Sequence, residues 1–248
     1  MKNLNLVFVL FLLTFKIYGQ HKKIDTLQQN KSTQFNYKSL IAPVSLITIG
    51  AIGIKSDSFK SFNSEIGEEI DEHIDKKFTI DDITQYVPAL SVYALNAVGI
   101  NGKNNFRDRT IILGIAYIIN RPVVSGLKDL VDVKRPDGSL NPDSWPSGHT
   151  ALSFMGAEFL YQEYKDVSIW YGISGYIVAS GTGFFRMYNN RHWLSDVIAG
   201  AGVGILSTKI AYWIYPFIKR NIFKGKNDRI VMPFYNGKEY GLGLSMIF

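Results

Sequence analysis

The tetrapeptide PSGH at residues 146–149 decides the fold of this chain, together with KDLVDVKRP at 128–136 and RMYNNRHWLSD at 186–196. The 248-residue chain has four histidines, and two of them belong to these stretches. At average composition, PSGH is expected by chance in on the order of one chain in a thousand. The three stretches in this order therefore indicate one site with a chemical role.

Three of the cations in these stretches are Lys128, Arg135 and Arg186. By itself, the pattern of Lys128 followed by Arg135 and a proline is typical of a solvated loop. Three cations that converge in a cleft would instead hold a phosphoryl group and neutralise the charge on its equatorial oxygens. The planar fork of an Arg side chain can bond two of those oxygens at once. The cations therefore predict a phosphate-binding site.

The PSGH stretch is expected to lead into a helix that begins near Thr150. Free backbone N–H groups at the start of a helix form an anion site. We expect the Ser147 hydroxyl and the Gly148 N–H to donate hydrogen bonds to phosphate oxygens. His149 would then lie beside the phosphate, where an imidazole can protonate a leaving alkoxide.

His192 and Asp196 are four residues apart, which places them on one face of a helix, one turn from each other. On its own, this pair is typical of a helix surface. A carboxylate that accepts from one ring nitrogen fixes the tautomer and leaves the other nitrogen with an attacking lone pair. The pair therefore predicts His192 as a nucleophile and Asp196 as the group that orients it.

These residues resemble the type 2 phosphatidic acid phosphatase (PAP2) superfamily, which also includes bacterial class A acid phosphatases and vanadium haloperoxidases. The pattern of that superfamily is K-x6-R-P, then P-S-G-H, then S-R-x5-H-x3-D. The match runs from Lys128 to Asp196. One position departs from the pattern, because Phe185 stands where the superfamily has Ser. This difference affects the fine geometry around the phosphate rather than the class of reaction.

The resemblance implies an all-α, PAP2/haloperoxidase-like helical bundle that is associated with a membrane. It also implies a phosphatase that uses no cofactor and no metal. His192 would be the nucleophile that forms a phosphohistidine, Asp196 its orienting partner and His149 the general acid. The residues that would bind phosphate are Lys128, Arg135, Ser147, Gly148 and Arg186.

Composition narrows the classes of function further. The chain contains no Cys, which excludes disulfides, thiol catalysis and Cys-based zinc sites. Its formal charge of +6 favours anionic partners. No nucleic-acid-binding motif is present, so we expect no nucleic acid among them. A mean hydropathy of +0.03 is low for a chain that consists mainly of membrane spans.

The chain is predicted to have four parts. Residues 1–20 read as a signal peptide, with an uncleaved anchor as the alternative. Residues 21–85 form an N-terminal segment with an apolar helix and an acidic amphipathic helix, the latter marked by Ile66, Ile70 and Ile74. Residues 86–218 form the PAP2 phosphatase domain. Residues 219–248 form a basic linker and a short C-terminal β-hairpin that turns at Asn236-Gly237.

Charge predicts on which side of the membrane the site lies. Segments 219–229 and 103–109 are rich in Lys and Arg and are expected to be cytoplasmic. The active site would then face the periplasm of a bacterial envelope. A cleaved signal peptide would place residue 21 in the periplasm. If every later apolar segment then crossed the membrane, the site would lie in the cytoplasm, so the two arguments differ by one crossing. The conflict disappears if segment 39–54 does not span, or if the whole domain packs against the periplasmic face of a membrane.

The leading hypothesis is a phosphatase acting on a phosphate monoester or diphosphate of a lipid-like or polyprenyl substrate. Membrane members of the superfamily act on phosphatidate, phosphatidylglycerophosphate, undecaprenyl diphosphate or lipid A. The main alternative is a soluble periplasmic acid phosphatase of broad specificity. A vanadate-dependent haloperoxidase could use the same residues. A non-enzymatic outer-membrane or scaffolding protein is supported only by the tail. Neither the substrate nor the oligomeric state follows from the sequence.

Overall fold

The computed structural model describes residues 37–59, 61–65, 79–140, 143–222, 229–235 and 240–246. Most of these residues are helical, which confirms the predicted all-α class. The elements, in chain order, are η2 (Tyr37–Leu40), α2 (Ile41–Lys55), α4 (Asp81–Thr84), α5 (Val87–Ala97), α6 (Phe106–Leu130), α7 (Gly148–Tyr164), α8 (Ile169–Tyr188), α9 (Leu194–Ile222), β1 (Arg229–Tyr235) and β2 (Tyr240–Met246). Residues 57–59 and 61–65 are also helical.

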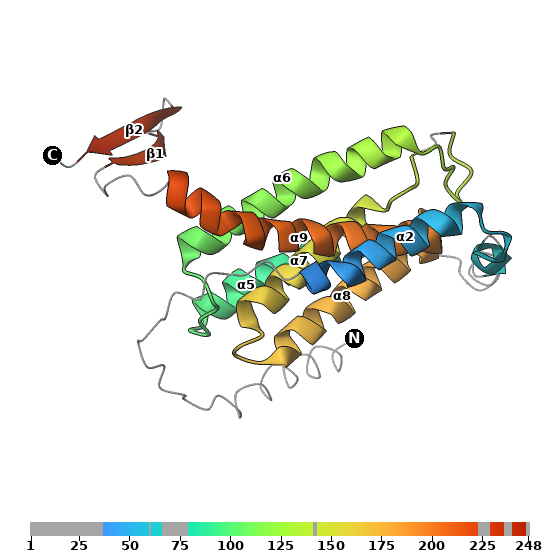
Figure 1. Ribbon diagram of the computed structural model, residues 1–248, viewed down its shortest axis with the longest axis horizontal. Helices are drawn as coiled ribbons and strands as arrows, with labels where there is room; N and C mark the ends of the chain where they lie inside the picture. Colours follow the sequence, from blue (N-terminus) through green and yellow to red (C-terminus); the bar gives the residue numbers. More distant parts are fainter. Residues whose placement is uncertain are drawn as a thin grey trace. The chain divides into compact units, whose positions relative to one another are not determined.

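Helices α7 and α9 form the centre of the bundle. Helix α7 packs against α8, α9 and α5, while α2 and α6 pack against α9 (Figure 1). Glycine makes the closest of these approaches possible. A Cβ atom at Gly200 of α9 would lie 2.6 Å from the backbone oxygen of Ser147. Helix α9 therefore lies against the backbone at the start of α7, where the PSGH stretch is found.

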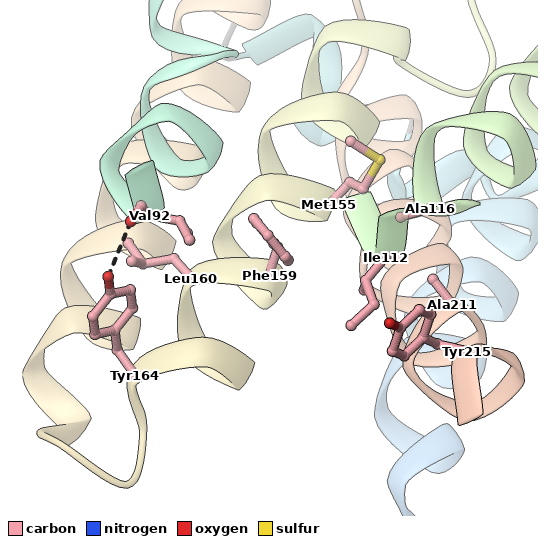
Figure 2. Close-up of a cluster of buried hydrophobic side chains, with 9 residues drawn as sticks. All are labelled: Val92, Ile112, Ala116, Met155, Phe159, Leu160, Tyr164, Ala211 and Tyr215. Atoms are coloured by element: carbon pink, nitrogen blue, oxygen red, sulfur yellow. Dashed lines mark hydrogen bonds between the residues drawn. The ribbon is translucent and has the colours of Figure 1, made fainter. Parts of the chain in front are cut away.

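The main apolar core lies along the later part of α7. Figure 2 shows its buried members, which come from α5, α6, α7 and α9: Val92, Ile112, Ala116, Met155, Phe159, Leu160, Tyr164, Ala211 and Tyr215. Tyr164 closes this core by donating its hydroxyl to the backbone oxygen of Val92 at 3.0 Å. Because the core occupies the C-terminal half of α7, the N-terminal end of α7 is left for polar residues.

Three helical segments are long and apolar enough to cross a membrane: Tyr37–Lys55, Phe106–Leu130 and Leu194–Asn221. Large apolar side chains lie exposed on the first two, among them Ile41, Ile52 and Ile118. The first segment contains residues 39–54, which one reading of the charge pattern leaves outside the membrane. By length and composition, that helix is also a candidate span.

Strand β1 pairs antiparallel with β2, from Arg229 opposite Met246 to Tyr235 opposite Tyr240. The turn predicted at Asn236-Gly237 lies outside the described residues, so a closed hairpin stays a prediction. The signal peptide at 1–20 and the isoleucine stripe of the acidic helix also lie outside the described residues.

Candidate active site

The predicted site residues gather where helices begin and end. Lys128 lies in the last turn of α6 and Arg186 in the last turn of α8. Ser147 is the N-cap of α7, and His149 is the second residue of that helix. Asp196 lies in the first turn of α9. Backbone N–H and C=O groups without helical partners are therefore concentrated around these side chains.

His192 is paired with Asp196 in the interior of the protein. The ring is 2% exposed, and its Nδ1 lies 3.3 Å from Asp196 Oδ2. Since a carboxylate only accepts, Nδ1 carries the proton and Nε2 keeps its lone pair. Burial lowers the pKa of His192 to about 4, with Arg186 and Lys128 acting in the same direction and Asp196 opposing them. The ring is therefore neutral near pH 7, as a nucleophile must be.

The prediction that His192 lies on a helix is wrong. It precedes α9, which begins at Leu194. The reason is that Asp196 caps the helix: its Oδ2 accepts the backbone N–H of Trp193 at 2.9 Å. The same oxygen serves the imidazole, so one carboxylate both starts α9 and holds the ring.

Ser144 is a site residue that sequence reasoning missed. It is fully buried, and its hydroxyl donates to Asp196 Oδ2 and lies 3.4 Å from His192 Nδ1. The backbone N–H of Ser147 donates to the Asp196 backbone oxygen at 3.0 Å. These contacts dock the segment before α7 onto the start of α9. A serine two residues before a motif carries no signal of its own, so only the fold identifies it.

The cations Lys128 and Arg135 meet at one acidic residue. Arg135 binds Asp143 with two hydrogen bonds, of 2.9 and 3.0 Å, which lower the pKa of that carboxyl. Lys128 Nζ donates to the Asp143 backbone oxygen and lies 3.4 Å from that of Ser144. Both cations are thus held beside the segment that leads to the PSGH stretch. Asp143 was not among the predicted site residues.

Helix α7 begins at Gly148, two residues earlier than predicted. The Ser147 hydroxyl oxygen accepts from the Thr150 backbone N–H at 3.4 Å and from the Thr150 hydroxyl at 2.9 Å. It is therefore the cap of the helix and retains its own hydrogen to donate. The donation of Ser147 and Gly148 to a phosphate stays a prediction.

Arg186 is buried beside two residues of α4 and α8 that the sequence did not indicate. Its Nη1 lies 2.5 Å from Asp81 Oδ2, and Asn189 Nδ2 donates to the other oxygen of Asp81 at 3.1 Å. Asp81 is only 1% exposed. Arg186 Nε is buried and has no hydrogen-bond acceptor among the described residues. This N–H can therefore donate a hydrogen bond to an incoming anionic oxygen.

His149 and Arg186 share a second carboxylate. His149 Nε2 lies 3.0 Å from Asp82 Oδ1, and Arg186 Nη1 lies 3.8 Å from the same oxygen. Burial and the charge of Arg186 lower the pKa of His149, while Asp82 and Asp81 oppose this shift. Arg186 also contacts the other histidine, because its backbone oxygen accepts the backbone N–H of His192 at 3.3 Å.

Asp81, Asp82 and His149 also form a group whose ligand atoms lie within 4.8 Å of one another. Sequence reasoning did not predict this cluster. The spacing alone would suit a metal ion, but Arg186 contacts both carboxylates. A guanidinium at that distance repels a cation, and it already neutralises the acidic charge. The arrangement therefore fits an ion-pair network better than a metal site.

The sequence model of the PAP2 superfamily matches residues 109–220, which contain all of the predicted site residues. This part of the chain is thus similar to the PAP2 superfamily.

Individual proteins are also similar to this chain. Lipid A 1-phosphatase of Porphyromonas gingivalis is 39% identical over 145 residues, covering 57% of this chain and 32% of that protein. The chain thus spans about a third of the length of this relative. A transmembrane PAP2 type phosphatidylglycerolphosphate phosphatase from Bacillus subtilis has the same fold, with a TM-score of 0.52 and 21% identity, over 73% of this chain and 98% of that chain. LpxE of Aquifex aeolicus has a TM-score of 0.44 and 23% identity, over 61% and 94% of the two chains.

The departure from the PAP2 pattern at Phe185 has a local explanation in packing. Its ring lies 5.9 Å from that of Phe184 and 5.7 Å from that of Tyr188, both edge-on. The side chain is part of an aromatic group near the end of α8. Arg186, the next residue, forms its ion pairs with the carboxylates of α4.

Proposed function

We propose that this chain is a member of the PAP2 superfamily, a phosphatase that removes phosphate from a membrane lipid through a phosphohistidine at His192. The buried His192–Asp196 pair carries the proposal, since it leaves a neutral ring with the Nε2 lone pair available. The Nε of Arg186, which has no acceptor in the part of the chain that the structure describes, offers a donor for a phosphate oxygen next to the same site.

The proposed reaction has two displacements at phosphorus. First, His192 Nε2 attacks phosphorus, the bond to the lipid oxygen breaks, and that oxygen takes a proton from His149. Asp196 stabilises the positive charge that forms on His192. A water molecule then gives a proton to His149 while its oxygen attacks phosphorus. The P–N bond breaks, and its electron pair returns to Nε2.

The lipid class of the substrate rests on the apolar helices of the bundle. Three helical segments are long and apolar enough to lie in a bilayer, and a substrate embedded there would reach the site without leaving the membrane. Two similar proteins are named for phosphorylated lipids, lipid A and phosphatidylglycerolphosphate. We extend the class, a phosphorylated lipid or polyprenol, to this chain. A soluble phosphatase of broad specificity would have no use for such helices.

We further propose that the site faces the periplasm. Lys219 near the end of α9 lies 2.5 Å from Asp108 near the start of α6, so these two helix ends lie together. Arg107 and Arg220 are at the same two ends. Basic ends favour the cytoplasm. Lys128 lies at the other end of α6 and Asp196 at the other end of α9, which supports a site on the opposite side of the membrane.

A phosphate-release panel on the purified protein tests the reaction. It contains phosphatidate, phosphatidylglycerophosphate, undecaprenyl diphosphate and lipid A, each assayed with and without EDTA. We expect at least one to be hydrolysed, with no loss in EDTA. His192→Ala should remove nearly all release, a loss of about 10⁵-fold or more. Release that persists in this variant would refute the assignment of the nucleophile.

The absence of cysteine makes the topology simple to test. Leu140, in the connection that follows Arg135, is 92% exposed and suits a single Leu140→Cys substitution. We expect a membrane-impermeant maleimide, applied to cells whose outer membrane alone is permeable, to label this cysteine. Phe106→Cys, at the opposite end of α6, should be labelled only after the inner membrane is opened. The reverse pattern would place the site in the cytoplasm.

A further inference from the structure

Helix α4 is held firmly against the predicted site, although it has only four residues, Asp81–Thr84. Asp81 is buried against Arg186 and Asn189 of the α8 end. The Thr84 hydroxyl lies 2.9 Å from that of Thr182 in α8. Asp82 lies between Asp81 and Thr84 in the chain. The contacts of these two residues therefore fix the backbone position of Asp82.

Asp82 differs from Asp81 in its surroundings. Its side chain is 57% exposed, yet its Oδ1 lies 3.0 Å from His149 Nε2. Gln85 Nε2 donates to the Asp82 backbone oxygen at 2.8 Å, which further fixes the residue. Since a carboxylate only accepts, the Nε2 proton of His149 is donated to Asp82. The arrangement repeats that of His192 and Asp196, where a carboxylate also holds one nitrogen of a ring.

We infer that Asp82 is a positioning residue for His149, holding the ring through Nε2 so that the proton on Nδ1 goes to the leaving oxygen of the substrate. This inference rests on the proposed function, because it assigns a partner to the predicted general acid. Nothing in the sequence patterns marks Asp82, which lies 46 residues before Lys128.

The charges around His149 explain why it needs such a partner. The groups that act on it are Arg186 at the end of α8 and Asp81 and Asp82 of α4. Arg186 disfavours a protonated ring, and Asp81 is already paired with Arg186. Asp82 therefore supplies the counter-charge that lets His149 hold a proton before it is transferred. When the proton has left, the neutral ring can take one from water in the second displacement.

Two small substrates distinguish this role from a structural one. Phenyl phosphate and p-nitrophenyl phosphate have nearly the same shape, but nitrophenolate leaves without needing a proton. With Asp82→Asn, we expect kcat/KM for phenyl phosphate to fall about 10-fold or more, within the roughly 10²–10⁴-fold that general acid catalysis supplies. For p-nitrophenyl phosphate the loss should stay below about threefold. The alkaline limb of the pH profile should move to lower pH.

Two further variants complete the experiment. Asp82→Glu keeps the carboxylate and should recover part of the lost activity on phenyl phosphate. Asp166→Asn removes an exposed carboxylate at the opposite end of α7 and should behave as the parent protein does. An equal loss on both substrates would overturn the inference, as would no loss on either. A gain in phosphate affinity would also overturn it, since Asp82 would then compete with the substrate.

Failure of this inference can be told apart from failure of the proposed function. His192→Ala should abolish turnover of both phenyl esters, because both require the nucleophile. If it does, and Asp82→Asn behaves like the parent protein, only the role of Asp82 is refuted. If His192→Ala remains active, the phosphohistidine mechanism itself is wrong.

Discussion

Asp196→Asn is the substitution that most directly probes how His192 is held. The carboxylate is fully buried and accepts three hydrogen bonds on Oδ2, from His192 Nδ1, the Ser144 hydroxyl and the Trp193 backbone N–H. Asn has the same shape but only one acceptor oxygen. If the amide nitrogen of Asn faces the ring, it donates to Nδ1, so His192 must carry its own proton on Nε2. The attacking lone pair is then lost.

The expected loss is large because the tautomer decides whether attack is possible. In hydrolases built on a carboxylate–histidine pair, the same change costs about 10⁴-fold in kcat. We expect about 10³- to 10⁴-fold here, which corresponds to about 4–5.5 kcal/mol in the barrier. KM should change little, since the cations that we propose to bind phosphate are untouched. An Asn nitrogen in the place of Oδ2 would also face the Trp193 N–H, so α9 should lose one capping hydrogen bond, a cost of about 1 kcal/mol in stability.

The assay is phosphate release under single-turnover conditions, with thermal unfolding measured in parallel. Ser207→Ala is the matched control in α9: its buried hydroxyl donates to the Val203 backbone oxygen, one turn earlier in the same helix. We expect this variant to retain its activity. A folded Asp196→Asn protein with activity within about threefold of the parent would refute the orienting role.

Two further predictions follow from the geometry. The kcat/KM profile should be bell-shaped and lie on the acid side of neutrality. As the pH is lowered, activity should fall near pH 4, because His192 becomes protonated. As the pH is raised, activity should fall before the usual pKa of histidine is reached, because the pKa of His149 is lowered and the ring loses its proton. An optimum well above pH 7 would contradict this pair of roles. Gly200→Val should lower stability by about 1–3 kcal/mol, because its Cβ would meet the Ser147 backbone oxygen at 2.6 Å. Thermal unfolding measures the change, and a midpoint equal to that of the parent would argue against the close approach of α9 to α7.

The helical class and the positions of the site residues could be predicted because each depends on local sequence. Apolar segments of helical length indicate the bundle, and the three stretches fall where helices start or end. A helix is expected to begin near Thr150; it begins two residues earlier, at Gly148, with Ser147, a residue type that favours the N-cap, as its cap. These features need no knowledge of which helices are neighbours.

The residues missed by sequence reasoning depend on tertiary contacts. Asp81 and Asp82 belong to an acidic stretch that looks like an exposed surface, and only the packing of α4 against α8 brings them to Arg186. Ser144 meets Asp196 across 52 residues of chain. The misplacement of His192 on a helix has a similar cause: spacing of four residues fits a helix, but it also fits a carboxylate that reaches back from the first turn.

The central claim is that His192 becomes phosphorylated, and trapping the intermediate tests it most directly. In His149→Ala, p-nitrophenyl phosphate can still phosphorylate the enzyme, but no base remains to activate the water of the second step. We expect a burst of nitrophenol equal to the enzyme present, and an acid-labile phosphoryl group mapped to His192 by mass spectrometry under basic conditions. A phosphoryl group on another residue, or steady turnover with no burst and no label, would contradict the account.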